Sequence, residues 1–338
     1  MTHGALTDEA LLSLPKAELH LHIEGTLEPG LAFELAARNG VELPFATVAE
    51  LSAQYDFDDL QSFLDLYYAT MAVLLTRDDF AELTRSYLRR AHAQGVRHVE
   101  LFFDPQAHTA RGVPFNAVVD GIGDALDEAE RDLGMSGALI LCFLRDQSVA
   151  SAEEALTAGL ARTDRIVGVG LDSAEVGFPP SLFEGVYARA RAAGLHAVAH
   201  AGEEGPPAYV REALDLLHAE RIDHGIRSIE DPELVARLAA ERVPLTVCPL
   251  SNLRLQATPD LREHPLLKLD AAGVLVTVNS DDPAYFGGYA GQNFTAVRDA
   301  LGLTEQQARR FARNSIEASF ASPERKRELL AELEGWQP

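Results

Sequence analysis

The sequence contains four side chains that could together bind one metal ion. His20 and His22 lie two residues apart. Alternate residues of a β-strand share a face, so both imidazoles can reach the same ion. A His-x-His pair alone is more often two half-buried histidines, but His200 and Asp281 would add a third imidazole and a carboxylate. Three nitrogens and one oxygen favour Zn²⁺ with an open position for water, although iron or manganese could also bind.

The lysine content bears on the number of metal ions. Many barrel hydrolases hold two metals bridged by a modified lysine from the barrel interior. This chain has three lysines, Lys16, Lys268 and Lys326, and none follows the fourth of the strand-like runs described below. The sequence therefore favours one zinc ion per subunit.

Two further residues could move protons during a reaction. Glu203 follows a glycine that lets the backbone turn sharply, and its carboxylate could reach a substrate atom near the metal. The alternative is a surface carboxylate in a loop. His224 could act as a base or orient a water molecule, although a lone histidine in such a run is more often part of the core.

The Ser280-Asp-Asp-Pro283 segment places two carboxylates side by side. Adjacent side chains project in different directions, so Asp281 could bind the metal and take part in catalysis while Asp282 binds the substrate. A bare Asp-Asp-Pro is usually only a turn. Its position after the last strand-like run supports the functional interpretation.

The elements that must position these residues are short apolar runs alternating with helical segments. Strands that alternate with helices pair in parallel, and eight such units predict an α/β fold of the (β/α)₈ TIM-barrel type. The C-terminal strand ends of a barrel meet at one mouth, and polar groups end or directly follow every run. The predicted strands are Ala17–Ile23, Val96–Phe103, Ala138–Leu144, Ile166–Leu171, Leu195–Ala199, Arg221–His224, Pro244–Cys248 and Val274–Asn279.

One connection is much longer than a single crossover helix needs. We predict a single domain over residues 1–338 with a helical, lid-like insertion at about 27–94, after the first strand. Its expected helices are Leu31–Arg38, Leu60–Leu74 and Asp78–Ala93. The insertion could close over the active site, or it could merely decorate the side of the barrel.

Composition excludes several classes of partner. A net charge of -23 argues against nucleic acid, whose binders carry clustered Lys and Arg. No apolar run approaches the ~18 residues that a membrane span needs, and the N-terminus does not resemble a signal peptide. Cys142 and Cys248 lie in apolar runs and are expected to be buried, reduced thiols. We therefore expect a cytoplasmic protein; its oligomeric state stays open.

Four segments together resemble the signature blocks of the adenosine/adenine deaminase family. They are PKAELHLH at 15–22, HAGE at 200–203, RIDHG at 221–225 and SDDP at 280–283. They occur in the family's order and span almost the whole chain. The resemblance implies a (β/α)₈ barrel with a helical insert after the first strand, and zinc-dependent hydrolytic deamination at purine C6.

The resemblance also implies a role for each of these residues. Glu203 would protonate purine N1, His224 would orient or deprotonate the attacking water, and Asp282 would hydrogen-bond N7. His20, His22, His200 and Asp281 would bind zinc.

Glu24 and Glu175 are expected to contact the substrate, and both favour adenine over adenosine. Nucleoside deaminases of the family commonly carry Asp where Glu24 stands, and Gly where Glu175 stands. The bulkier Glu175 could fill ribose space and accept the ring N–H that only the free base carries; alternatively, it could cap its own loop. Ala174 departs from the serine expected in the adenine branch. Adenosine, N6-substituted adenine and aminodeoxyfutalosine therefore remain alternatives.

Other readings stay open at this stage. The chain could be a zinc amidohydrolase acting on a different ring, or a silent barrel that only binds purines or metal. The latter is disfavoured because none of the expected acid, base or ligand positions is substituted. Phe57, Phe63 and Phe103 could stack on the purine, although core packing is the more common role for such residues.

Overall fold

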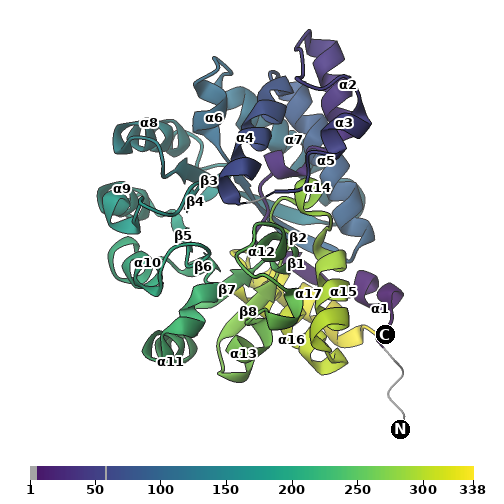
Figure 1. Cartoon of the computed structure of the whole chain (residues 1–338), viewed down its shortest axis with the longest axis vertical. Coiled ribbons are helices and arrows are strands. Elements are labelled where there is room, and N and C mark those ends of the chain that lie inside the picture. The colour runs from purple at the N-terminus through teal and green to yellow at the C-terminus, as the bar shows by residue number, and fades with distance from the viewer. Residues whose placement is uncertain (1–5, 58) are drawn as a thin grey trace.

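Eight parallel strands surround a common axis in the order β1 to β8, each paired with its neighbour in the chain. The computed structural model describes residues 6–57 and 59–338. Figure 1 shows the strands at the centre and the helices around them, which confirms the predicted barrel. The strands are β1 Lys16–Glu18, β2 Val96–Phe103, β3 Ser136–Leu144, β4 Ile166–Asp172, β5 His196–Ala201, β6 Arg221–His224, β7 Pro244–Val247 and β8 Leu275–Val278.

The first strand is shorter than predicted, because regular pairing stops at Glu18. The Leu19 N–H donates to the side chain of Asn279 instead of to a neighbouring strand (3.0 Å). Beyond this point the chain closes the barrel by single contacts. The Asp281 N–H donates to the His20 carbonyl (3.0 Å), and the His22 N–H donates to the Asp281 carbonyl (3.1 Å). This closure brings the first and last segments of the barrel together.

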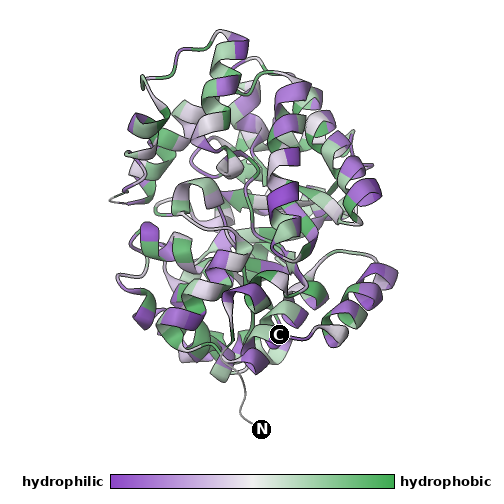
Figure 2. Ribbon diagram, turned by 90° about the vertical axis from the view of Figure 1, so that its right-hand side faces the viewer, coloured by the Kyte–Doolittle hydropathy of each residue, from purple (hydrophilic) through white to green (hydrophobic). Residues whose placement is uncertain are grey.

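Amphipathic helices form the outer ring, with hydrophilic and hydrophobic residues alternating along them (Figure 2). Their apolar faces cover the strands, and the largest core cluster runs through the whole barrel. The ring and the terminal helices are α5 Arg77–Ala93, α7 Phe115–Leu133, α8 Val149–Leu160, α9 Glu184–Ala192, α10 Pro207–Glu212, α11 Pro232–Glu241, α13 Leu266–Ala271, α15 Ala290–Leu301, α16 Glu305–Ala318, α17 Pro323–Gly335 and α1 Asp8–Ser13.

Shorter helices follow several of the strands and line the loops at the mouth. They are α6 Pro105–Thr109, η3 Pro180–Phe183, η5 Ile226–Glu230, α12 Pro249–Arg254, η6 Leu261–Glu263 and α14 Pro283–Phe286, whereas η4 Ala213–Leu217 continues α10 toward β6. In Figure 1, α12 and α14 lie in front of the strands. No helix within 6–57 or 59–338 combines the length and the apolar character needed to cross a membrane.

The predicted insertion after the first strand is helical throughout most of its length. It contains η1 Glu24–Thr26, α2 Pro29–Asn39, α3 Val48–Ser52, α4 Leu60–Thr70 and η2 Met71–Val73. The side chain of Asp59 caps α4 by accepting the Ser62 N–H (2.8 Å). Helix α5, which the prediction included in the insertion, instead packs beside α7 as a ring helix; Arg77 and Arg85 bridge to acidic residues of α7. Only the part before α5 extends over the mouth.

Candidate metal centre and active site

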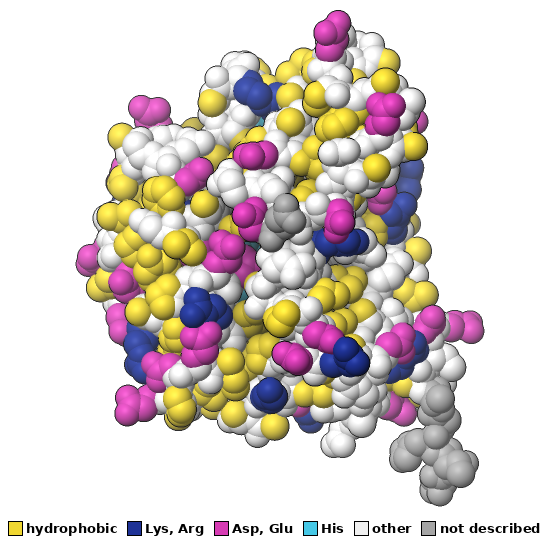
Figure 3. Space-filling model, viewed as in Figure 1, with side chains coloured by type: hydrophobic (Ala, Val, Ile, Leu, Met, Phe, Trp, Pro, Cys, Tyr) yellow, Lys and Arg dark blue, Asp and Glu magenta, His cyan; other side chains and the backbone are white. Residues whose placement is uncertain are grey.

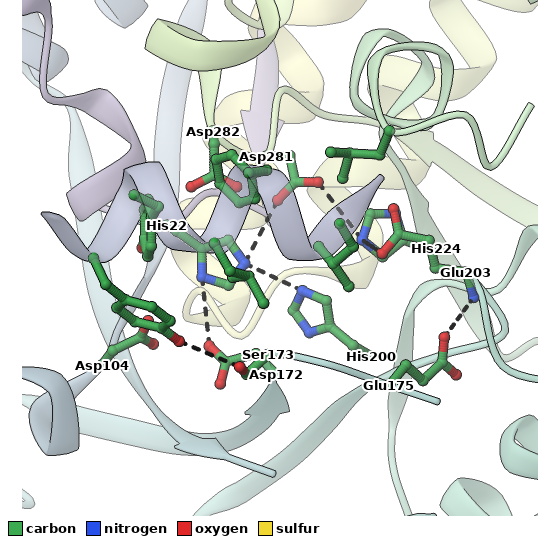
Figure 4. Close-up of a pocket in the computed structure, with 16 residues that line it drawn as sticks. His22, Asp104, Asp172, Ser173, Glu175, His200, Glu203, His224, Asp281 and Asp282 are labelled. Carbon is green, nitrogen blue, oxygen red and sulfur yellow. Dashed lines mark hydrogen bonds and ion pairs between the residues drawn. The ribbon is translucent and has the colours of Figure 1, made fainter. Parts of the chain in front are cut away.

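Four side chains from three parts of the barrel converge at its mouth. His20 and His22 follow β1, His200 lies near the end of β5, and Asp281 follows β8. Figure 4 shows how His22, His200 and Asp281 face one another. The Nε2 atoms of His22 and His200 lie 3.1 Å apart. Asp281 Oδ1 lies 3.4 Å from His20 Nε2 and 3.5 Å from His22 Nε2. All four residues are buried.

The other ring nitrogen of each histidine faces an oxygen. His20 Nδ1 lies 3.0 Å from the Thr246 carbonyl. His22 Nδ1 lies 3.5 Å from Asp172 Oδ2, and His200 Nδ1 lies 3.7 Å from Asp223 Oδ2. The Thr246 carbonyl can only accept, so it keeps the hydrogen of His20 on Nδ1 and leaves Nε2 of this ring to face a metal.

This donor set fits a zinc ion. The Nε2 atoms of His22 and His200 face each other at 3.1 Å, close enough for both to bind one cation. His20 Nε2 is buried without a hydrogen-bond partner. Three imidazole nitrogens and one carboxylate match the ligands that Zn²⁺ prefers. The four predicted ligands therefore come together as a site that zinc would fill.

Two residues at the mouth have strained backbone conformations. Asp281 and His224 both adopt left-handed backbone conformations, with φ values of 65° and 60°. Residues other than glycine rarely occupy this region, and such strain is often found at functional sites. Both side chains line the pocket.

Glu203 and His224 form the proton-handling side of the site. Glu203 Oε2 lies 3.4 Å from His224 Nε2, which lies 3.6 Å from Asp281 Oδ2. Burial, together with the charges of Asp281 and Glu175, raises the pKa of Glu203 well above its ordinary value. Burial lowers the pKa of His224 to about 3. The pair therefore combines a protonated carboxyl group with a neutral imidazole.

Asn252, at the mouth end of β7, connects these two side chains. Its amide nitrogen lies 3.2 Å from Glu203 Oε1 and 3.1 Å from His224 Nδ1. The sequence analysis gave this residue no role. It belongs to the polar group that follows the seventh predicted strand, so its place at the mouth was predictable although its contacts were not.

Asp282 faces the pocket without a protein partner for Oδ1. A Cβ at Gly25 would come within 1.9 Å of Asp282 Oδ1, so glycine at that position makes room for this carboxyl group. Burial and the neighbouring Asp281 raise the pKa of Asp282 well above its ordinary value. A buried polar atom without a partner in the protein is available to a ligand.

Glu175 lies under the loop that carries Glu203. Its Oε1 accepts the Gly202 N–H at 2.6 Å, and its Oε2 accepts the N–H groups of Glu203, Glu204 and Gly205 at 3.1, 2.9 and 2.8 Å. The geometry thus favours the loop-capping alternative for Glu175 over a direct contact with the purine.

Replacing Glu175 by glutamine tests this role. An amide offers one acceptor oxygen and turns an N–H₂ group toward backbone donors, so the Glu203 loop loses its anchor. We expect kcat to fall by about 10- to 100-fold, or roughly 1.4–2.7 kcal/mol, with a smaller change in KM for adenine. Glu204→Gln removes a neighbouring charge without touching these bonds and should retain activity. A changed preference between adenine and adenosine, with kcat intact, would support substrate contact instead.

The structure does not bring Glu24 to the pocket, in contrast to its predicted contact with substrate. Its Oε1 accepts the Asp104 N–H (3.1 Å) and lies 2.7 Å from His108 Nε2. The longer glutamate side chain reaches behind the Asp104 loop, where His108 holds it. Glu24 therefore lies behind the residues that line the pocket and helps to hold them in place.

The pocket wall facing the metal ligands comes from helix α4 and the ends of β2 and β4. Asp104 and Asp172 stand at these strand ends and contribute buried carboxyl groups, for which the sequence analysis gave no role. Of the three predicted stacking candidates, Phe63 lines the pocket, whereas Phe57 and Phe103 pack in the core. The α4 residues of the wall are Leu60, Phe63, Leu64, Tyr67 and Tyr68.

The fold and the four ligands define the class of metal-dependent amidohydrolase barrels. Residues 15–336 match the family described as adenosine deaminase, and the chain belongs to this family. An adenine deaminase of Streptomyces coelicolor is 62% identical over 330 residues, which cover 97% of each protein. The matched range spans all four blocks that carried the resemblance.

Two solved structures resemble the barrel closely. The adenine deaminase of Arthrobacter aurescens superimposes with a TM-score of 0.94 at 58% identity, covering 96% of this chain and 99% of that one. An amidohydrolase of Burkholderia ambifaria, with bound Zn, gives a TM-score of 0.90 at 30% identity and covers 99% of this chain and 93% of that one.

Proposed function

We propose that this chain hydrolyses adenine to hypoxanthine and ammonia. The observation that carries the proposal is the grouping of Glu203, His224 and Asp282 around the four metal ligands, in a chain 62% identical to an adenine deaminase along its length. Deamination of a 6-aminopurine needs a group that orients or deprotonates the water attacking C6, an acid at N1 and a hydrogen-bond partner at N7.

Glu203 acts as the acid toward purine N1. The C6 atom of an aromatic ring is a poor electrophile until N1 accepts a proton, so the carboxyl group must arrive protonated. Burial supports this state by raising the pKa of Glu203. Its hydrogen bond from Asn252 leaves Oε2 free to face the substrate.

His224 and Asp282 hold the other reacting groups. His224 orients or deprotonates the attacking water, while Asp282 hydrogen-bonds N7 from the opposite side of the ring. When bound by His20, His22, His200 and Asp281, a single zinc ion per subunit supplies Lewis-acid activation of water near neutral pH. Asp281 also faces His224, so we include it among the catalytic residues.

The pocket suits a small uncharged purine. Among the residues described, its lining includes no Lys or Arg, whereas it includes six Asp and Glu side chains. Asp and Glu also outnumber Lys and Arg in the whole chain, 52 to 29, and on the face shown in Figure 3 acidic side chains are the more frequent. The lining thus offers no cationic side chain to pair with a phosphate group, which disfavours nucleotides.

The insertion bears on access to the site. We propose that α4 acts as a lid within a single-domain chain, because its residues line one wall of the pocket. Closing such a segment would exclude water from the purine. Both cysteines are free and buried, which agrees with a reducing compartment, and we propose the cytoplasm.

Ammonia release from adenine, adenosine, an N6-substituted adenine and AMP, measured in parallel on zinc-loaded protein, tests the proposal. We expect turnover of adenine to exceed that of the others. Faster turnover of adenosine would reassign the chain to nucleosides. No turnover of any purine in a sample with full zinc content would contradict the proposal.

A further inference from the structure

A chain of hydrogen bonds leads from the first residue of α13 to the imidazole of His224. It begins at the Leu266 N–H, which donates to His264 Nδ1 at 3.1 Å. A backbone amide can only donate, so Nδ1 of His264 must accept. His264 is buried, and burial lowers its pKa to about 4. The neutral ring therefore carries its hydrogen on Nε2.

The second step orients Asn252. His264 Nε2 lies 3.2 Å from Asn252 Oδ1 and donates to it. The amide group then presents its nitrogen to Glu203 Oε1 at 3.2 Å and to His224 Nδ1 at 3.1 Å. The reversed amide would place the Asn252 N–H₂ group against the His264 N–H, donor against donor. The fixed hydrogen of His264 thus selects one orientation of the amide.

The third step concerns His224 itself. Because Asn252 donates to Nδ1, that nitrogen accepts, and a neutral imidazole has its only hydrogen on the other nitrogen. His224 Nε2 faces the reacting side, 3.4 Å from Glu203 Oε2 and 3.6 Å from Asp281 Oδ2.

We propose that His264 is a positioning residue that holds His224 in the Nε2–H tautomer. This inference rests on the proposed function, and it means that His224 donates a hydrogen bond to the attacking water. It orients the water and stabilises developing negative charge instead of removing a proton. His264 acts without touching the substrate, since Asn252 stands between it and the site.

The tautomer can be measured on the zinc-loaded enzyme without a substrate. Nitrogen-15 spectra of the histidine side chains distinguish protonated from unprotonated ring nitrogens, and the signals of His224 are assigned by their loss in His224→Gln. We expect the wild type to show protonated Nε2 and unprotonated Nδ1. His264→Gln keeps a side-chain donor for Asn252 and should preserve this pattern. His264→Leu removes the donor and should give a mixture of tautomers.

Kinetics separate positioning from mere packing. We expect His264→Leu to lower kcat by about 10- to 100-fold, with KM nearly unchanged. A catalytic histidine held in the wrong tautomer lowers kcat in this way. His264→Gln should recover most of this loss. Arg262→Ala, an exposed change in the same turn, controls for disturbance of the loop and should match the wild type.

Protonated Nδ1 in the wild type, or an unchanged tautomer in folded, zinc-loaded His264→Leu, would overturn the inference. Thermal unfolding and zinc content establish that the variants are folded and loaded. The spectra do not depend on which purine is deaminated, so failure of the proposed substrate would leave this test intact.

Discussion

Replacing Glu203 by glutamine is expected to remove nearly all deaminase turnover and to leave the zinc content unchanged. Glutamine has the same shape and can keep the contact with Asn252, but it cannot transfer a proton to N1. General acid catalysis contributes about 10²- to 10⁴-fold. Because the substrate needs N1 protonation before attack at C6, we expect the loss to lie at the upper end of this range. Ammonia release and metal analysis of the same sample measure both effects.

The neighbouring Glu204→Gln provides the matched control for this change. Glu204 carries the same charge one residue further along, and its side chain is partly exposed. We expect it to retain most activity. Substantial activity in a zinc-loaded Glu203→Gln sample would refute the role of Glu203 as the acid, whereas loss of zinc would show that the variant had disturbed the metal centre.

Loss of the metal centre is the second change with a large expected effect. His200→Ala removes one of three imidazoles and leaves the Nε2 of His22 without its partner at 3.1 Å. We expect the variant to lose zinc and turnover together. A bound ligand stabilises the folded state by about 2.7 kcal/mol at 100 times its Kd, so added zinc should raise the melting temperature of metal-free wild type but not of the variant.

His196→Ala is the control on the same strand. His196 begins β5, is exposed, and pairs with Glu220 at the opposite end of the barrel from the site. It should keep zinc, turnover and the response of the melting temperature to added zinc. Full zinc content in His200→Ala would contradict the ligand set. Turnover by metal-free wild type would contradict a metal-dependent reaction.

Much of the site was predictable because its residues stand at strand ends. Alternation of apolar runs and helical segments predicts a parallel barrel, and a barrel brings all C-terminal strand ends to one mouth. That geometry alone places His20, His22, His200, His224 and Asp281 together, and the structure confirms that they meet. The same geometry also brings Asp104, Asp172 and Asn252 to the mouth, although no role was predicted for them from the sequence.

The contacts of individual side chains were less predictable. Glu175 and Glu24 were expected at the substrate because both replace smaller residues of nucleoside deaminases. In the structure, Glu175 accepts four N–H groups of the 202–205 loop, and Glu24 contacts His108. A flexible carboxylate turns to the nearest free donors, and these come from segments distant in the sequence.

The sequence by itself determined the kind of fold and which polar side chains stand at the strand ends, because periodicity and residue type suffice to bring strand-end groups to one mouth; the roles of zinc ligand and acid stay predictions. Only the tertiary structure decided how those groups are held. The early end of β1, the cap on the Glu203 loop and the path from Leu266 through His264 and Asn252 to His224 depend on hydrogen bonds between separate segments. The directions of these hydrogen bonds are set when the barrel closes and the loops pack, and no local pattern in the chain encodes them.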